Sequence, residues 1–491
     1  MLTLLAWLLA TAPLRATTLA LVGAGLVTVV LVRPAWGLYG LAFAIPFGSL
    51  QDVAFGPARL GGAEAWLALI LIAWLAQRAV RHGFGDLGVP LRFPLALFLG
   101  LAVFSTLWTE SLSVSVKELA KWAEVAVLYV FVATQVKRKE VLWIALAFVI
   151  AGALAASQGI YQAVARSGPP GFLFPLAGRV FLRAYGTFQQ PNPYAGYLGL
   201  TAPLAYGLLL GLLSQGNTFA GGKPIPSWRG GRPAATLIAG GALALMGVAM
   251  VLTLSRGGWL GFAAAMVVVS VLVSRRTAAL LALAVFLGSS ALLLSSFHLL
   301  PPSLVQRATN FLPFLGNWDL TQIAVTPQNF AVVERLAHWR AGWLMFAAHP
   351  WAGVGFGNYP VAYAAFALPD WTDPLGHAHN YYLNVLAELG IAGLIAYLAL
   401  WATAGRLVWQ AIRWSTGIER GIAVGILGII VHLSVHNLVD NLFVHAMYLQ
   451  IAVILGLLAV LAGNRRSDAE SAPATVTTGL SQSVEPFTGG A

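Results

Sequence analysis

The sequence contains no cysteine and few charged residues. Without cysteine the chain forms no disulfide, no thiolate metal site and no cysteine nucleophile, and the compartment stays undecided. Charged residues make up 9% of the 491 residues, against about 25% in soluble domains. The net charge of +11 does not indicate nucleic-acid binding, because the basic residues follow the membrane topology described below.

Long apolar runs dominate what remains, and hydrophobic residues make up 59% of the chain. Runs of about twenty residues cross the ~30 Å hydrocarbon core as helices. We therefore predict an all-α polytopic membrane protein. The predicted spans are 17–32, 35–50, 62–77, 92–108, 118–135, 141–164, 193–213, 234–253, 258–273, 277–297, 380–402, 421–438 and 443–463. Residues 2–12 are apolar but short, so 12–14 helices are expected, and no cleavable signal peptide is expected at the start.

Lysine and arginine set the expected orientation, since they concentrate in cytoplasmic connections. If the spans alternate, six basic clusters fall on one side, which we assign to the cytoplasm. They are Arg78/Arg81/Arg92, Lys137/Arg138/Lys139, Lys223/Arg229/Arg232, Arg275/Arg276, Arg406/Arg413/Arg420 and Arg465/Arg466.

This topology divides the chain into four parts. Residues 1–297 form an N-terminal transmembrane bundle and 298–379 one large extracytoplasmic loop; 380–463 form the C-terminal transmembrane helices and 464–491 a disordered cytoplasmic tail rich in Ser, Thr, Ala, Gly and Pro. Within the loop, 332–348 has the periodicity of a helix on the membrane surface, with Trp339, Trp343 and Phe346 on its apolar side. The Gly-Val-Gly-Phe-Gly stretch that follows resembles a phosphate loop only weakly, because no strand precedes it.

Four arginines lie on the side where positive charge should be sparse. Arginine stays charged and offers a planar fork of donors that suits a phosphate or lipid diphosphate. The alternative is that each arginine reaches the interface or pairs with Glu334, Asp319 or Asp440. Tight glycine-containing turns favour the phosphate interpretation for two of them, Arg183 and Arg256, whereas the structural alternative is favoured for Arg340; Arg335 lies on the same predicted loop helix.

His377 and His379 stand where the long loop meets a membrane span, in the sequence His-Ala-His-Asn that ends at Asn380. The imidazole pKa lies nearest neutrality, which suits a general base acting on a hydroxyl. The alternative is that the histidines cap the helix and solvate the loop. A metal held with Asp370 or Asp373 is disfavoured, because i, i+2 spacing is not a recognised zinc pattern.

Other polar residues lie in or beside the spans. Glu388 is more than two turns into the span after His379, where an ionisable group is normally functional or paired. His432, His436 and His445 line a polar cavity or, the favoured reading, hydrogen-bond between helices.

The ordered set of short motifs resembles the O-antigen ligase and polymerase family of bacterial envelope glycosyltransferases. It covers residues 180–395 and comprises Arg183-x-x-Gly-x-Phe-x-x-Pro-Asn, Ser255-Arg256-Gly257, Arg335-x-x-x-Trp339, Pro350-x-x-Gly353-x-Gly355, His379-Asn380-x-x-Leu383 and Glu388-x-Gly390-x-x-Gly393. The resemblance implies a GT-C-like, metal-independent enzyme of the cytoplasmic (inner) membrane, without cofactor, whose active site faces the periplasm. Its donor would be an undecaprenyl-diphosphate-linked glycan.

The resemblance also implies roles for particular residues. His379 would be the general base on the acceptor hydroxyl, with His377 orienting the acceptor or supporting the base. Arg183, Arg256 and Arg335 would bind the donor diphosphate, Asn380 and Glu388 would support the site, and the reaction would invert the anomeric centre.

Several functions remain open at this point. We expect an O-antigen ligase of lipopolysaccharide biosynthesis, with the lipid A core as acceptor. A polysaccharide polymerase and a protein O-oligosaccharyltransferase are the alternatives within the superfamily. A membrane transporter is the alternative from another class, but the polar residues gather at one face rather than at mid-membrane, as a crossing pathway would require. The sequence identifies neither the sugar nor the oligomeric state.

Overall fold

The fold is seen in a computed structural model that describes most of the chain. The described residues are 13–48, 53–55, 58–80, 88–176, 179–214, 232–273, 276–279, 282–283, 314, 320, 323–326 and 329–463. The segment 2–12, most of the predicted span 277–297 and the predicted tail 464–491 lie outside them.

Within the described residues the chain is almost entirely helical, which confirms the predicted fold class. The membrane-length and shorter helices are α2 (Leu14–Val32), α3 (Gly37–Phe47), α4 (Gly62–Val80), α5 (Arg92–Phe104), α6 (Leu112–Gln135), α7 (Val141–Ala165), α8 (Pro191–Ser214), α9 (Arg232–Leu252), α10 (Arg256–Val273), α13 (Phe330–Ala348), α14 (Tyr359–Phe366), α15 (Tyr381–Trp414), α16 (Gly417–His436) and α17 (Met447–Ala462). Two antiparallel hairpins add β1 (Val53–Phe55) with β2 (Ala58–Leu60), and β3 (Leu173–Leu176) with β4 (Arg179–Leu182).

The predicted spans coincide with these helices, apart from the span 277–297. Among the described residues, seven helices are long and apolar enough to cross a membrane, and four further apolar helices are shorter. The helix α6 belongs to neither group, and it carries Lys117, Glu118, Lys121 and Glu124. The chain is therefore a multi-pass membrane protein, while the total of 12–14 crossings stays a prediction.

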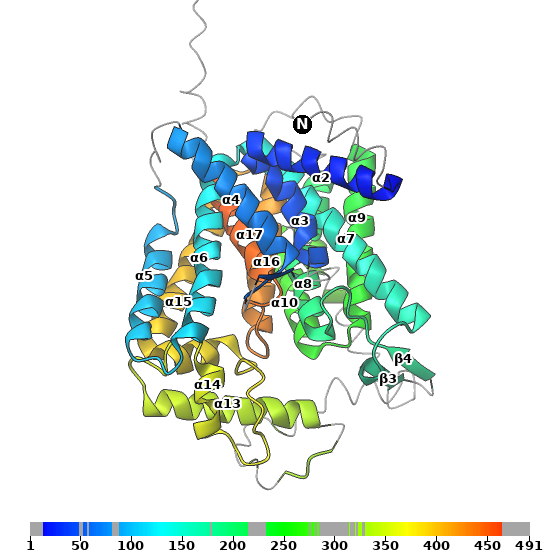
Figure 1. Cartoon of the computed structure of the whole chain (residues 1–491). Helices are drawn as coiled ribbons and strands as arrows, with labels where there is room; N and C mark the ends of the chain where they lie inside the picture. Colours follow the sequence, from blue (N-terminus) through cyan, green and yellow to red (C-terminus); the bar gives the residue numbers. More distant parts are fainter. Residues whose placement is uncertain are drawn as a thin grey trace, which may run out of the picture.

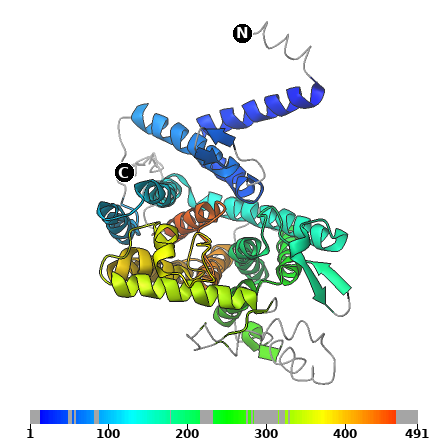
Figure 2. The same cartoon turned by 60° about the horizontal axis from the view of Figure 1, so that its bottom comes forward.

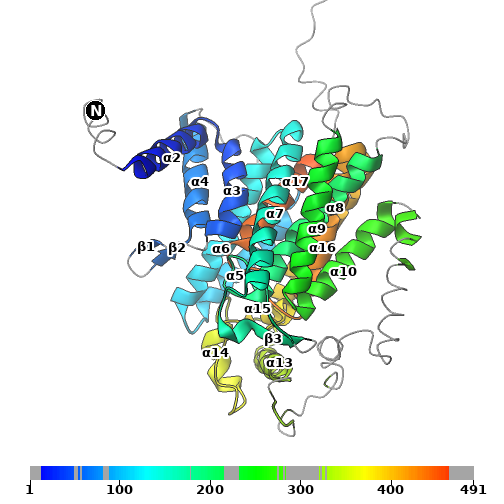
Figure 3. The ribbon, with the colours of Figure 1, turned by 90° about the vertical axis from the view of Figure 1, so that its right-hand side faces the viewer.

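Two glycine pairs bring α8 and α16 into close contact at the centre of the bundle. Gly207 and Gly211 on α8 face Gly421 and Gly425 on α16, and a Cβ on Gly207 would overlap the main chain of α16. Small residues four apart let transmembrane backbones approach closely, where dispersion and packing replace the hydrophobic driving force. This contact fixes the N-terminus of α8 and the C-terminus of α16 at the same end of the bundle (Figure 3).

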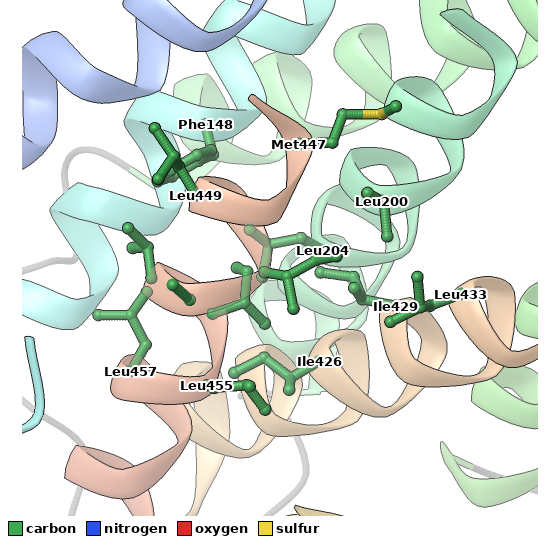
Figure 4. Close-up of a cluster of buried hydrophobic side chains, with 14 of the residues drawn as sticks. Phe148, Leu200, Leu204, Ile426, Ile429, Leu433, Met447, Leu449, Leu455 and Leu457 are labelled. Carbon is green, nitrogen blue, oxygen red and sulfur yellow. The ribbon is translucent and has the colours of Figure 1, made fainter. Parts of the chain in front are cut away.

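The apolar core surrounds this helix pair. Figure 4 shows buried side chains from four helices meeting there. They include Phe148 from α7, Leu200 and Leu204 from α8, Ile426 and Ile429 from α16, and Leu449 and Leu457 from α17. Such packing leaves α8, α10, α15 and α16 as rigid supports for the loops at their ends.

The helix predicted over 332–348 is present as α13, which lies across one end of the bundle (Figures 1 and 2). The face of α13 that packs against the rest of the protein contains Val333, Ala337, Ala341 and Met345, at a spacing of four residues. Trp343, on the predicted membrane-facing side, is 53% exposed. The small alanines allow close approach to the neighbouring helices, which a tryptophan would prevent.

The long helix α15 is broken at Gly390, where φ is +65° and ψ is −164°. The break leaves main-chain groups without helical partners, and the glycine turn (residues 350–358) supplies them. The replacement bonds run from Val354 N to Ala387 O (3.0 Å), from Gly355 N to Glu388 O (2.9 Å) and from Ile391 N to Pro350 O (2.9 Å). The glycine turn is therefore bound to a transmembrane helix through its amides rather than offering them to a phosphate.

Replacing Gly390 with alanine is expected to destabilise the fold by at least about 1–2 kcal/mol, since an L-residue strains at positive φ. A Cβ there would also overlap the main chain of Trp351. Gly405→Ala is the matched control on the same helix, because nothing lies within 4 Å of its Cβ position, and alanine favours a helix. Thermal unfolding in detergent tests this: equal midpoints for the two variants would contradict the break at Gly390.

Candidate active site

A cavity of about 540 Å³ opens at the end of the bundle that α13 covers. Its polar wall contains Arg183, Arg256 and Arg335, three of the predicted site residues, together with Asp440. Its apolar wall is formed by Leu254, Trp259, Leu260, Phe314, Ala331, Val332, Leu336 and Val439. The cavity thus joins a cationic surface to an apolar one, as a lipid with an anionic headgroup requires.

Arg183 and Arg256 meet through the turn between α9 and α10. The Nε of Arg183 donates to Thr253 O at 2.8 Å, and its Nη2 donates to Asn192 Oδ1 at 3.3 Å. Arg256 is the first residue of α10, and Ser255 Oγ accepts from Gly258 N at 3.4 Å. The positive end of the α10 helix dipole therefore adds to the two guanidinium groups at the cavity.

Arg335 comes from α13 and closes the cationic wall from the other side. Its Nε donates to Val439 O at 3.2 Å and its Nη1 donates to Ala331 O at 2.8 Å. Its Nη2 lies 3.9 Å from Asp440 Oδ2. These contacts fix the guanidinium group while leaving donors for a ligand.

Asp440 links the arginines to His379. Its Oδ1 lies 3.6 Å from His379 Nδ1, and the same carboxylate accepts from Asn441 N at 2.9 Å. The neighbouring His379, and then the charge of Arg335, hold the pKa of Asp440 well below its usual range, although burial opposes them. An ionised carboxylate beside an imidazole stabilises the imidazolium that forms when the ring takes a proton.

His377 contacts the main chain and the ring of His379. Its Nδ1 accepts from His379 N at 3.0 Å, and the two rings are 4.4 Å apart. Burial, and then the neighbouring His379, lower the pKa of His377 to about 3. His377 is therefore neutral near pH 7, with its proton on Nε2 and its Nδ1 accepting the main-chain hydrogen bond.

The two histidines and Asp440 together have the composition of a metal site. His377, His379 and Asp440 each offer a ligand atom, all within 4.8 Å of one another. Asp440 thus replaces the Asp370 or Asp373 considered from the sequence. The His377 Nδ1 bond to the main chain places the proton on Nε2, however, so ligation through Nε2 would break that bond. This donor set favours proton transfer over metal binding.

Asn380 and Glu388 hold the main chain around the site. Asn380 is the N-cap of α15, and its side chain accepts from Leu383 N at 3.1 Å. The buried Glu388 carboxylate accepts from Gly357 N at 2.9 Å and Tyr359 N at 3.1 Å. Both residues therefore position the loops on either side of α15 without lining the cavity.

Other residues considered from the sequence lie away from the cavity wall. Arg340 is not among its lining residues. His432 and His436 are fully buried on α16, with His436 Nδ1 3.3 Å from His432 Nε2. Both rings also pack against α10, His436 beside Gly257 and His432 beside Gly261.

Two residues at the site went unassigned in the sequence reasoning. The sequence predicts Asp440 only as an alternative partner for an arginine, and Trp339 as an apolar residue within the Arg335-x-x-x-Trp339 motif. The cavity wall includes both. The signal for Asp440 was present, because it is an acidic residue in a short turn on the same side as the arginines.

Comparisons with known proteins find matches over part of the chain. Residues 241–398 match the family model described as O-Antigen ligase, a stretch that includes Arg256, Arg335 and His379. An O-antigen ligase of Pseudomonas aeruginosa is 28% identical over 205 residues, which cover 40% of this chain. Over these residues the chain is similar to the O-antigen ligases.

The relationship covers part of the molecule. The match spans 43% of the length of the Pseudomonas protein, less than half. A solved structure of a peptidoglycan synthase complex aligns over 76% of this chain and 96% of its own, with 19% identity and a TM-score of 0.36. That score is too low to equate the two folds.

Proposed function

We propose that the protein is a membrane glycosyltransferase that moves a glycan from an undecaprenyl-diphosphate carrier to an acceptor hydroxyl. Within this class we propose an O-antigen ligase with the lipid A core as acceptor, acting at the outer face of the cytoplasmic membrane. One observation carries the proposal: three arginines and Asp440 come from four separate parts of the chain and line one amphipathic cavity. His379 lies next to this wall, with its Nδ1 3.6 Å from Asp440 Oδ1.

The cavity suits the donor in charge and in shape. The diphosphate lies against the three arginines and the N-terminus of α10, and the first isoprene units lie against the apolar wall. A cavity of about 540 Å³ holds only the head of such a lipid, so the rest of the chain extends into the bilayer.

The reaction then follows from the positions of these groups. His379 takes the proton of the acceptor hydroxyl while its oxygen forms a bond to the anomeric carbon. The bond from that carbon to the diphosphate oxygen breaks, and the electron pair leaves with the diphosphate. Arg183, Arg256 and Arg335 stabilise this charge, and Asp440 stabilises the imidazolium. Attack opposite the leaving group inverts the anomeric configuration.

The basic residues at the other end of the bundle support the assigned side. Arg138 pairs with Glu419 at 2.9 Å and donates to Leu461 O at 3.2 Å, where α7 and α16 begin and α17 ends. The cavity lies at the opposite end, beside the N-terminus of α10 and the C-terminus of α16. Under the positive-inside rule the cavity therefore faces the periplasm.

A reconstituted transfer assay tests the function. The full chain in nanodiscs is incubated with an undecaprenyl-diphosphate oligosaccharide and lipid A core, in buffer containing EDTA. We expect the glycan on the lipid A core. If longer lipid-linked chains form instead, the protein is a polymerase and not a ligase. Transport of the intact donor across a vesicle membrane, with no glycosidic bond formed, would contradict the assignment as a transferase.

A further inference from the structure

The main chain of His379 is held by side chains on both sides of its α-carbon. Its φ is +51°, a conformation uncommon for a residue other than glycine. Its N–H donates to His377 Nδ1 at 3.0 Å, and its carbonyl accepts from Trp339 Nε1 at 3.2 Å. Two side chains thus stabilise a backbone conformation that is unfavourable by itself.

The ring of His379 is held less firmly than its main chain. Nδ1 lies 3.6 Å from Asp440 Oδ1, beyond hydrogen-bonding distance. Within the part of the chain that the structure describes, neither ring nitrogen makes a shorter polar contact. The direction of the imidazole therefore depends on the peptide groups beside it.

Trp339 is joined to the donor side of the cavity through α13. It follows Arg335 by four residues, so both side chains leave the same face of the helix, and both line the cavity. One helix face therefore carries a cation for the diphosphate and the hydrogen-bond donor that holds the base.

We propose that Trp339 is a positioning residue for the transfer reaction: its indole N–H fixes the left-handed peptide of His379 and so aims the imidazole at the acceptor. The inference rests on the proposed function. Trp339 acts through His379 and takes no proton itself. Because α13 also carries Arg335, the distance between base and diphosphate is set by a single rigid element.

Trp339→Phe removes the indole N–H and keeps an aromatic wall on the cavity. We expect kcat to fall by about ten- to a hundredfold, since a misplaced catalytic group costs up to about 10²-fold. The KM for the donor should change less than about twofold, because the ring and Arg335 remain. Trp343→Phe, one turn further along α13 and 53% exposed, is the matched control and should leave kcat unchanged.

A double-mutant cycle tests whether Trp339 acts through the base. In the His379→Ala background, Trp339→Phe should cause no further loss of activity. An equal loss in both backgrounds, or an increase in kcat with Trp339→Phe alone, would overturn the proposal. In the second case the indole shields the base instead of positioning it.

Hydrogen–deuterium exchange provides a readout that does not need the transfer reaction. In Trp339→Phe, the peptide covering residues 376–382 should exchange faster, and in Trp343→Phe it should not. Unchanged exchange would overturn the positioning role, whatever the protein catalyses. If the phenylalanine variant does not fold, Trp339→Tyr, which fills more of the indole volume, takes its place in the same comparisons.

Discussion

Replacing His379 with alanine is expected to lower the transfer rate by about 10²–10⁴-fold, the usual contribution of a general base. Asp440, His377 and the three arginines all stay in place, so donor binding should persist. The measurement is the initial rate of glycan transfer at saturating donor and acceptor, with thermal unfolding to show that the variant is folded.

The matched control is His349→Ala. His349 follows α13, is exposed and does not line the cavity, so its loss should leave the rate unchanged. A His379→Ala enzyme that is folded and retains near-normal activity would remove the proposed base.

Replacing Arg256 with alanine is expected to lower kcat/KM for the donor by about 10²–10³-fold, comparable to the loss of one preorganised donor to a developing anion. The residue begins α10 and lines the cavity beside Arg183, where the proposed donor would place its diphosphate. The KM for the acceptor should change little. Steady-state kinetics with each substrate varied in turn separates the two effects.

Arg340→Ala is the control for charge alone. It removes one arginine from the same end of the molecule, at a position that does not line the cavity. If Arg256→Ala and Arg340→Ala impair donor use equally, or if Arg256→Ala raises mainly the KM for the acceptor, the diphosphate is bound elsewhere.

The helices were predictable because membrane insertion constrains the sequence directly. A span needs an apolar run of a given length, and basic residues mark one side. Two details were not predictable from the apolar pattern. The helix α15 continues to Trp414, beyond the predicted span, and α13 packs its alanine face against the rest of the protein. Apolar periodicity cannot distinguish a face covered by protein from one covered by lipid.

The candidate site was predictable only in part. An arginine on the side where cations are sparse stands out in a sequence, as does a histidine at a membrane boundary. The contacts of Asp440 with His379 and Arg335 cannot be recognised in the sequence, because they join residues 61 and 105 positions apart along the chain. The bond from Trp339 to the His379 carbonyl also leaves no pattern in the sequence.

For Glu388 the sequence indicates a functional or paired residue, whereas the structure gives it main-chain hydrogen bonds. A carboxylate in a transmembrane helix indicates function or pairing. The structure gives it two main-chain donors, Gly357 and Tyr359, in place of a cation or a substrate. Only the break at Gly390 explains why a carboxylate is needed at that point, because there the glycine turn replaces helical hydrogen bonds.

The most direct measurement is a cryo-electron microscopy structure of the His379→Ala variant with a bound undecaprenyl-diphosphate oligosaccharide. We predict both phosphates within hydrogen-bonding distance of Arg183 and Arg256, and the anomeric carbon facing residue 379 beside Asp440. A diphosphate bound away from these arginines, or an anomeric carbon on the far side of the cavity from residue 379, would contradict the account.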